Sequence, residues 1–494
     1  MSRINKKNLN RVISYLKRNG LRSSLINISE RLSRDNDEAN YTQKVISNRA
    51  SEEELKEQRK RKFKRPVKVS ILLPAYETEE NLLLETIESV AKQSYGNWEL
   101  CIADASQNDS RRILIKEYIS QNTLKYSDDF GRLNDKIKYQ HLEKNQGISG
   151  NTNEALKMAT GDYIALLDHD DLLEADTLFQ YMSAMEEAET RYNNGVESFL
   201  KIQVVYCDED KITYDNTRYF DYHKKPDFNP YLLCTNNYIC HFLMVDASLA
   251  KSVEGFHSEF DGAQDHDFVF RCTEGLSRDR IVHVPKALYH WRSTPNSTAE
   301  NPEAKLYAYQ AGKRAIEEHL KRVGVLAKVK ETEHMGFFDV EFSTKVPTEA
   351  VQVMKLSEYK ASSEDKLSEI DSKYVLILSE DYSAISSEAL SILCGPMEND
   401  DVGAVTGRIV GKNSRLESAG YDKIESGQFV PRFKGLNKNY SGYLHRAKMQ
   451  QKVDGFDEGF VLIRKDSVKR WLPKIELKDK YDIFFEPKVE IKRK

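Results

Sequence analysis

An apolar run that ends in a cluster of acids most strongly limits what this chain can fold into. Residues 163–167, of sequence YIALL, have the length and composition of a buried parallel strand. Three carboxylates follow within four residues, and like charges this close repel unless a cation or solvent relieves them. Asp168 and Asp170, at Asp-X-Asp spacing, suit a hard divalent ion such as Mg²⁺ or Mn²⁺ that is bound together with substrate phosphates. The alternative is an acidic turn that caps the following helix.

Strands and helices alternate ahead of this run, which predicts an α/β fold with a doubly wound, mostly parallel sheet. Ligands of such sheets bind beyond the carboxyl ends of the strands. Glu77, Asp104 and the acids 168–171 all follow strand ends, so three acidic loops on one rim indicate a binding site. The predicted strands are 69–73, 98–103 and 137–142, and the predicted helices are about 80–93, 110–120 and 152–158.

Length and composition set the broad class. A chain of 494 residues is too long for one ordinary core, so two or more domains are expected. Hydrophobic residues make up 39% and charged residues 31%, and no apolar run approaches the roughly 20 residues that span a bilayer. No signal-peptide pattern opens the chain. The six cysteines form no Cys-X-X-Cys pair, which favours a reduced, cytoplasmic protein.

The first 34 residues hold nine Lys or Arg and one acid, Glu30. Their apolar residues fall at helical spacing on both sides of Gly20, which predicts a basic amphipathic helical segment. It would either lie on an anionic membrane surface or pack on the protein itself. Residues 35–50 show no pattern, and residues 51–65 read as a charged helix that Pro66 ends. Nucleic acid is not an expected partner, because interleaved aromatics and a recognised binding module are missing from the sequence.

The order of motifs from about residue 66 to 324 resembles the inverting family 2 glycosyltransferases of the GT-A fold. The resemblance is closest to bacterial members that build capsule, O-antigen or cell-wall polysaccharides. It implies a nucleotide-sugar donor (a UDP- or dTDP-sugar), a glycan or lipid-linked acceptor, and a divalent metal. The motifs that carry it are VSILLPAYE at 69–77, ADAS at 103–106, GIS at 147–149, LDHDD at 167–171, YCDEDK at 206–211, NYICH at 237–241, GAQDHD at 262–267 and HWR at 290–292.

Transfer from such a donor builds negative charge on the departing diphosphate, which a divalent ion stabilises. By resemblance, Asp168 and Asp170 anchor the ion, His290 completes its site, and Arg292 meets the diphosphate. Acids can bind the nucleoside, because that end of the donor offers N–H and O–H groups. The residues assigned to the nucleotide sugar are Pro74, Ala75, Tyr76, Glu77, Asp104, Gly147, Asp168 and Arg292. For His290 a buried structural role is the alternative, and for the acids, turn stabilisation.

The acceptor hydroxyl must lose a proton as it attacks, and a carboxylate within hydrogen-bond reach can take it. The family places an Asp that opens a helix in this role, usually after Glu. The match here is Gln264-Asp265, so Asp265 is the predicted base, and helix N-capping is the alternative. Asp267 is expected to be structural. The residues assigned to the acceptor are Asp208, Asn237, His241 and Trp291, although Asp208 to Asp210 also reads as a simple turn. Residues 293–300 read as a lid over the donor.

The residues after 344 read as a degenerate repeat of the same fold. Residues 372–381 align with 162–170, and Gly455-Phe456-Asp457-Glu458 continues in the same manner. Ser379 stands where Asp168 stood, and residues 344–372 leave no room for a nucleotide-binding half. The predicted domains are therefore a leader (1–65), a GT-A catalytic domain (66–344) and a degenerate GT-A-like domain (345–494) that binds acceptor glycan, a partner or its own copy.

The combined prediction is an inverting, metal-dependent glycosyltransferase that works at the cytoplasmic face of the cell membrane. A catalytically silent subunit that organises a synthesis complex is the alternative from another class. A nucleotidyltransferase would instead carry a Gly-rich, Lys/Arg-bearing phosphate loop after the first strand, and residues 74–77 (PAYE) are not such a loop.

Overall fold

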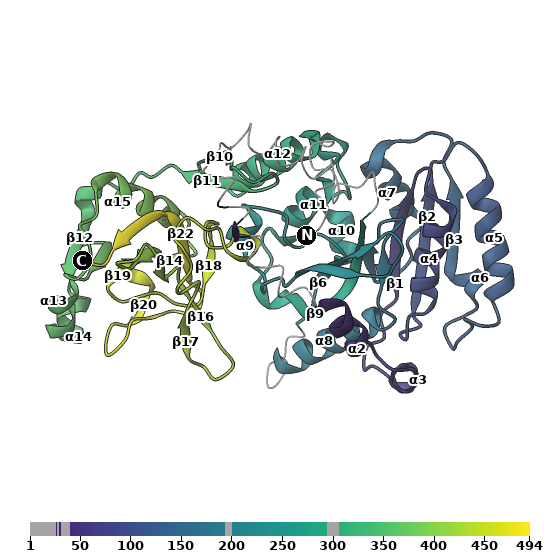
Figure 1. Cartoon of the computed structure of the whole chain (residues 1–494), viewed down its shortest axis with the longest axis horizontal. Helices are drawn as coiled ribbons and strands as arrows, with labels where there is room; N and C mark the ends of the chain where they lie inside the picture. The colour runs from purple at the N-terminus through teal and green to yellow at the C-terminus, as the bar shows by residue number, and fades with distance from the viewer. Residues whose placement is uncertain (1–25, 27–28, 31–39, 193–199, 294–305) are drawn as a thin grey trace. The chain divides into compact units, whose positions relative to one another are not determined.

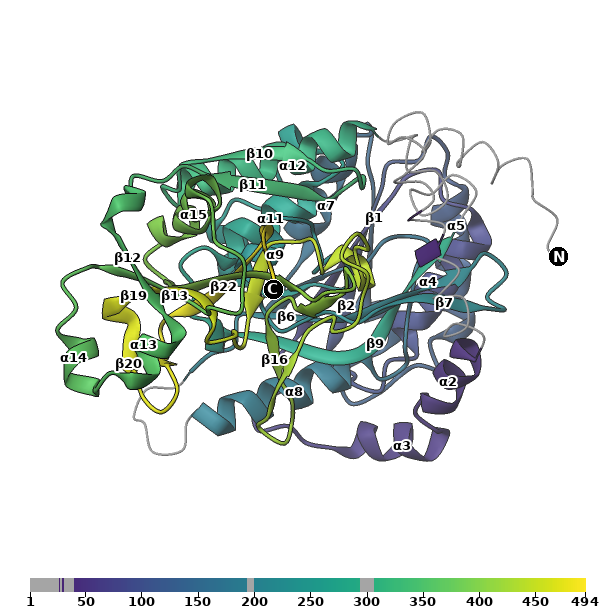
Figure 2. The ribbon, with the colours of Figure 1, turned by 60° about the vertical axis from the view of Figure 1, so that its left-hand side comes forward.

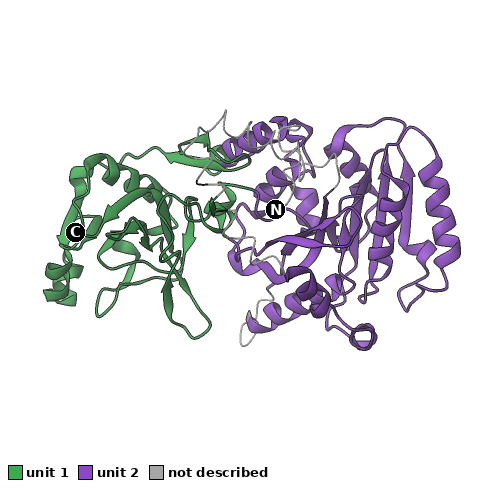
Figure 3. Ribbon diagram, viewed as in Figure 1, with its two compact units in different colours: residues 1–36, 229–236, 320–494 green, residues 37–228, 237–319 purple. Residues whose placement is uncertain are grey.

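The structure, a computed structural model, describes residues 26, 29–30, 40–192, 200–293 and 306–494. It divides into two compact units (Figure 3). Unit 2 holds residues 37–228 and 237–319, and unit 1 holds residues 1–36, 229–236 and 320–494. The predicted leader lies mostly outside the described residues, as does the predicted lid at 293–300. No helix among the described residues is long and apolar enough to cross a membrane.

Unit 2 is built on a nine-stranded sheet in the order β3-β2-β1-β4-β8-β6-β9-β5, with β7 paired to β6 (Figure 1). The block β3-β2-β1-β4 is parallel, and β8 joins it antiparallel to β4. Beyond β8, β6 and β9 run parallel to each other. The strands are β1 (Val69–Ala75), β2 (Trp98–Asp104), β3 (Ile137–His141), β4 (Tyr163–Leu166), β5 (Leu172–Leu173), β6 (Val204–Thr213), β7 (Tyr219–His223), β8 (Met244–Asp246) and β9 (Ile281–Ser293).

Helices connect and cover these strands. All seven residues of β1 are buried, as a parallel strand covered on both faces requires. On one face, Val69, Ile71 and Leu73 share a core with apolar residues of α4 and α8. The helices of unit 2 are α2 (Tyr41–Asn48), α3 (Glu52–Lys60), α4 (Glu80–Ala91), α5 (Ser110–Asn122), α6 (Leu133–Lys136), α7 (Gly147–Met158), α8 (Thr177–Tyr192), α10 (Ala247–Ser252) and α11 (Gln264–Thr273), with most of α12 (Leu306–Arg322).

The predicted strands and helices of the parallel block are confirmed, with shifts at their ends. One expectation and one alternative were wrong. Residues 41–48 form helix α2, although the sequence there shows no pattern. The acids 208–210 lie within strand β6 and are buried, so they are not a turn. Strands β6 and β9 lie side by side in Figure 1 and Figure 2. This pairing brings the second half of β9 against these acids.

A buried carboxylate ties the amino-terminal ends of three of these strands together. Glu99 of β2 is 1% exposed and accepts hydrogen bonds from Ser70 Oγ and Thr160 N, both at 2.6 Å. It also forms ion pairs with Lys68 and Lys138. Burial alone would raise the pKa of Glu99, but these partners outweigh burial and lower the pKa from 4.5 to about 2.

Glu99→Gln is therefore expected to destabilise unit 2 at neutral pH by about 1.5–3 kcal/mol, the scale of hydrogen bonds to a charged group. Because the folded-state pKa is depressed, the contribution is complete above pH 4.5 and is lost as the pH falls towards about 2. Urea unfolding at several pH values should show the gap between wild type and variant closing over that window. Glu154→Gln, which removes a surface pair with Lys157, should cost only about 0.3–0.5 kcal/mol. A gap that stays constant down to pH 2 would contradict this account.

Unit 1 has a seven-stranded sheet in the order β12-β13-β19-β14-β22-β18, with β15 paired to β14. Its strands are β12 (Val351–Lys355), β13 (Tyr374–Leu378), β14 (Val402–Val410), β15 (Leu416–Ser418), β18 (Gln451–Val453), β19 (Phe460–Arg464) and β22 (Asp482–Lys492). Short hairpins join β10 (Ala327–Glu331) to β11 (Phe338–Phe342), β16 (Tyr421–Lys423) to β17 (Phe429–Pro431) and β20 (Val468–Arg470) to β21 (Glu476–Leu477). The helices of this unit are α9 (Pro230–Leu233), α13 (Leu356–Ala361), α14 (Glu364–Ser368) and α15 (Ser387–Cys394).

A run of five strands in this second sheet repeats a run of five strands in the first. The run β12-β13-β19-β14-β22 has the same chain order and the same parallel and antiparallel pairings as β1-β4-β8-β6-β9. The hairpin β14–β15 corresponds to β6–β7. Strand β12 is the edge of the sheet, so within residues 306–494 nothing takes the place of β2 and β3. The aligned strands Tyr163–Leu166 and Tyr374–Leu378 thus occupy equivalent positions, as the sequence predicted.

One sequence similarity within the repeat joins positions that are not equivalent. Gly455 and the three residues after it precede β19, whereas the similar sequence that begins at Gly255 follows β8, the equivalent strand. The two sequences are alike but are not at the same point of the fold.

Candidate functional site

The predicted rim exists at the carboxyl ends of the parallel strands of unit 2. Glu77 follows β1, Asp104 is the last residue of β2, and the acids 168–171 follow β4. Since these strands are hydrogen-bonded neighbours running in the same direction, their ends open on the same edge of the sheet.

The three acids after β4 differ in their surroundings. The side chain of Asp168 is 52% exposed, and that of Asp170 is 24% exposed. Asp171 is fully buried and accepts hydrogen bonds from Tyr289 Oη and from the backbone N–H of Arg292, the latter at 2.7 Å. Burial raises the pKa of Asp170 and raises that of Asp171 further, with the neighbouring acids adding to the effect on Asp171. Asp171 therefore anchors the loop, while Asp168 and Asp170 can face a ligand.

Asp265 lies in the first turn of α11, close to this loop. Its Oδ2 accepts a hydrogen bond of 2.6 Å from Asn237 Nδ2. Burial raises the pKa of Asp265, the positive charge of His241 opposes that effect, and Asp168 adds to it. The N-cap of α11 is Ala263, and Asp267 is buried in an ion pair with Arg271. The structure thus brings the predicted base near Asp168 and gives Asp267 a structural contact.

Behind Asp168 lies a charged cluster that the sequence did not predict. Glu209 of β6 forms ion pairs with Lys225 at 2.8 Å and, at 3.3 Å each, with Nδ1 of His223 and Nδ1 of His241. Burial alone would raise the pKa of Glu209, but its partners hold the pKa well below the usual value. Burial lowers and Glu209 raises the pKa of His241, with a net rise to about 9. The Glu209 carboxylate therefore holds three basic side chains together in this part of the rim.

Several predicted residues are enclosed by the protein's own groups. Asp208 is fully buried and accepts hydrogen bonds from Tyr222 Oη, from the backbone of Lys225 and from Nε2 of His283 at 2.6–2.8 Å. His290 is 1% exposed, and its two ring nitrogens lie 2.6 Å from Asp210 and 2.9 Å from Glu174. For His290 this arrangement matches the alternative of a buried structural role. For Asp208 it leaves no side-chain oxygen exposed to solvent.

Arg292 is likewise enclosed, since it is fully buried and faces Asp170 O, Asn216 Oδ1 and Glu85. Its guanidinium therefore supports the acidic loop through the hydrogen bond to the Asp170 carbonyl. Trp291, next to it, is partly buried, and its ring centroid lies 5.4 Å from that of His241.

The other residues assigned to the nucleotide lie at the ends of β1 and β2 and at the start of α7. Tyr76 is 44% exposed, and Glu77 has a left-handed backbone, with φ of 49°. Asp104 is 1% exposed and accepts from Ser106 and, at 2.8 Å, from Tyr139 Oη. Pro74 and Ala75 are the last two residues of β1 and are buried.

Gly147 begins α7 with φ of 79°, and a Cβ there would lie 2.4 Å from Asp261 Oδ2, so glycine is required. The amino end of α7 is thereby closed by the Asp261 carboxylate, which also accepts from Ser149 N.

Comparison with known proteins identifies the region that carries the rim. Residues 70–247 match the family described as glycosyl transferase family 2. The uncharacterized protein y4gI of Sinorhizobium fredii is 40% identical over 256 residues, which are 51% of this chain and 25% of that protein. The O-antigen biosynthesis protein RfbC of Myxococcus xanthus is 28% identical over 267 residues, 54% of this chain and 19% of that protein. The chain therefore spans a quarter or less of the length of these two relatives.

A crystal structure of S. aureus TarS 1-349 in complex with UDP-GlcNAc aligns with 51% of this chain and 66% of its own, at 20% identity and a TM-score of 0.38. The family match, together with the mixed sheet described above, confirms the predicted α/β fold class. The chain therefore carries a glycosyl transferase family 2 domain, and the matched residues include Glu77, Asp104 and Asp168 of the rim.

Proposed function

We propose that this protein is an inverting, metal-dependent glycosyltransferase of bacterial surface polysaccharide synthesis. It would move a sugar from a UDP- or dTDP-sugar to a glycan or lipid-linked acceptor. The observation that carries the proposal is that one segment, residues 237–241, reaches both acids. Asn237 donates a hydrogen bond to Asp265, and Nε2 of His241 lies 3.9 Å from Asp168, which belongs to the family 2 match. A base and a cation-binding acid on one rim are what this reaction needs.

In this proposal Asp265 takes the proton of the attacking hydroxyl, and Asn237 orients the carboxylate through its hydrogen bond. Asp168 and Asp170 would hold a Mn²⁺ or Mg²⁺ ion, for which carboxylate oxygens are suitable ligands. When bound, the ion would supply charge stabilisation for the departing diphosphate. Glu77 and Asp104 would accept hydrogen bonds from the nucleoside. Arg292 is proposed to keep the acidic loop in place, because its guanidinium is enclosed by protein groups.

The test is donor hydrolysis by the purified chain. A panel of UDP- and dTDP-sugars would be incubated with and without Mn²⁺, and release of the nucleoside diphosphate would be measured. Release of one nucleotide class, dependent on Asp265, supports the proposal. Donor binding without any release or transfer would instead favour the silent subunit that organises a synthesis complex.

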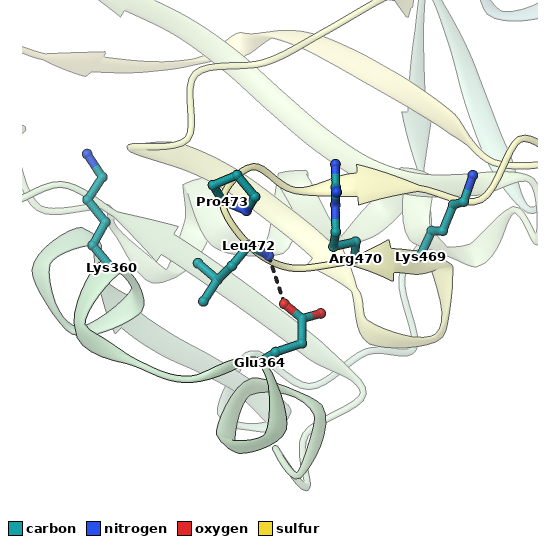
Figure 4. A pocket seen from close by; sticks show the side chains of 6 residues that line it. All are labelled: Lys360, Glu364, Lys469, Arg470, Leu472 and Pro473. Carbon is teal, nitrogen blue, oxygen red and sulfur yellow. Dashed lines mark hydrogen bonds between the residues drawn. The ribbon is translucent and has the colours of Figure 1, made fainter.

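For unit 1 we propose a binding role in place of catalysis. Its sheet has an apolar core of its own, but the described residues of the unit include no counterparts of β2 and β3, and Ser379 takes the place of the first proposed metal-binding acid. A pocket of about 770 Å³ in this unit is lined by Lys360, Glu364, Lys469, Arg470, Leu472 and Pro473. The three basic side chains point to one side of it, with the two apolar residues between them (Figure 4). Cations around an apolar floor suit an acidic glycan acceptor.

Glu380→Ala combined with Asp381→Ala is therefore expected to change donor turnover by less than about twofold, because neither acid contacts a donor site in this proposal. Glu380 bonds Ser357 at the surface, so the fold should be kept. Lys360→Glu with Lys469→Glu is the contrasting variant, and it should weaken action on a long acidic acceptor while hydrolysis of the donor is unchanged. A large loss of donor turnover in the Glu380/Asp381 variant, with the fold intact, would show a second active site.

The leader is proposed to contact an anionic membrane, with the protein peripheral at the cytoplasmic face. One described residue of the leader has another contact. Glu30 is 5% exposed and accepts hydrogen bonds from Ser441 N, Ser441 Oγ and Gly442 N at 2.6–3.1 Å, all within unit 1. Membrane contact would therefore involve the basic residues before Glu30, while Glu30 itself fixes this part of the leader to unit 1. The proposed partners also include a second copy of this chain or another subunit of a synthesis complex.

A further inference from the structure

His241 presents one ring nitrogen to the most exposed acid of the rim. Its Nε2 lies 3.9 Å from Asp168 Oδ2, while its Nδ1 faces Glu209 Oε2 at 3.3 Å. The ring lies flat against that of Tyr289, with centroids 4.9 Å apart and planes 9° apart. The contacts with Glu209 and Tyr289 thus fix the orientation of the imidazole and direct Nε2 towards Asp168.

The gap between these two atoms has the size of a shared cation. A distance of 3.9 Å is too long for a hydrogen bond. Two ligands that each lie about 2.1 Å from one ion can be up to ~4.2 Å apart, and a half-exposed aspartate can turn to shorten the distance. A carboxylate on the second ring nitrogen is also the usual arrangement that orients a histidine bound to a metal. Glu209 holds this position relative to His241.

The backbone next to His241 has a strained conformation, which helps to position the imidazole. Cys240 has φ of 42°, a left-handed conformation that is unfavourable for a cysteine. Its N–H bonds to Asn237 Oδ1 at 3.2 Å, and the same Asn237 donates to Asp265. One short segment therefore positions both the proposed base and the imidazole.

His290, the histidine that the sequence suggested for the metal, cannot play this part without rearrangement. Both of its ring nitrogens are within 2.9 Å of carboxylates, so neither has a lone pair directed at the rim. We propose that His241, in place of His290, is the imidazole that joins Asp168 in binding the divalent ion, with Glu209 as its positioning residue. This inference rests on the metal dependence in the proposed function.

The experiment measures metal binding and needs no turnover. Mn²⁺ would be titrated into the full chain in the presence of excess UDP, with free Mn²⁺ followed by its electron paramagnetic resonance signal. His241→Phe keeps a ring on Tyr289 but removes both nitrogens, and Mn²⁺ affinity should fall by at least about 10-fold. His319→Phe is the matched control, because Nδ1 of His319 also pairs with a glutamate, Glu274, and its ring also stacks on an aromatic ring, that of Phe270, outside the charged cluster around Glu209. Its affinity should stay within about twofold of wild type.

Thermal unfolding would show whether each variant keeps its fold. If His241→Phe unfolds, His241→Gln, which can still bond to Glu209, carries the same expectation. Affinity of a folded His241 variant within twofold of wild type would overturn the inference, as would a wild type that binds no Mn²⁺. Donor hydrolysis and sugar transfer by wild type would in either case leave the proposed transferase activity standing, so the two failures can be told apart.

Discussion

Asp265→Asn is expected to lower the rate of sugar transfer by roughly 10²-fold or more, the usual scale for loss of a general base. Burial raises the pKa of the Asp265 carboxyl, which makes it a stronger proton acceptor than an exposed aspartate. The amide that replaces it cannot take a proton at neutral pH, although its oxygen can still accept the hydrogen bond from Asn237. Donor and metal binding should therefore be kept while chemistry is lost.

Single-turnover transfer and calorimetric donor binding would separate these two effects. Removing a negative charge from the first turn of α11 should itself cost only about 0.3–1 kcal/mol of stability. Glu259→Gln is the matched control, since Glu259 is exposed just ahead of the same helix and should leave both measurements unchanged. Weaker donor binding with undiminished turnover of bound donor would assign Asp265 to the donor site.

The parallel half of unit 2 could be predicted because its strands carry their signal locally. A strand covered on both faces is apolar throughout, and residues 69–75 show this directly. The acids at the strand ends then fall on one rim whatever the details of the loops. Helix α2 was missed because its side chains are mostly exposed and its apolar face is short, so no periodicity marks it.

The charged half of the site could not be predicted from the sequence, because it depends on pairing between distant strands. His290 lies opposite Asp210 in the β6–β9 register, and Glu209 lies opposite both His223 and Tyr289. These pairings decide which histidine is enclosed by acids and which faces the rim. The run Asp208 to Asp210 was itself a signal, since three acids inside a buried strand need basic partners.

The repeat was recognised from one apolar strand and one changed residue, Ser379. A diverged domain must keep the apolar residues of its core, whereas it can lose the residues that carried out the chemistry. The register supports that alignment, since Val69 pairs with Tyr163 and Val351 with Tyr374. The similar sequences at Gly255 and Gly455 lie at different points of the two sheets, because a short turn sequence suits several points of the same fold. Core strands are therefore better guides to equivalence in a diverged repeat than turn motifs are.

Asp168→Asn is expected to abolish Mn²⁺-dependent transfer, lowering it by roughly 10²-fold or more, because the lost ion would supply several kcal/mol of charge stabilisation. Its side chain is half exposed and no hydrogen bond of the described structure depends on it, so the folded protein should be as stable as wild type. Turnover against Mn²⁺ concentration, with Mn²⁺ binding measured alongside, would check both parts.

Asp171→Asn, three residues away, should instead lower the stability of the fold and leave the metal-dependent activity in place. Asp171 accepts from Tyr289 and from Arg292 N, and an asparagine offers one acceptor oxygen where two are needed, so one donor is left unpaired at about 1–3 kcal/mol. The variant should unfold at lower temperature yet keep its Mn²⁺ dependence while folded. Asp170→Asn, with an intermediate exposure, should follow Asp168 in activity. Undiminished turnover in both Asp168→Asn and Asp170→Asn would remove the metal site from this rim, because no other acids of the loop face solvent.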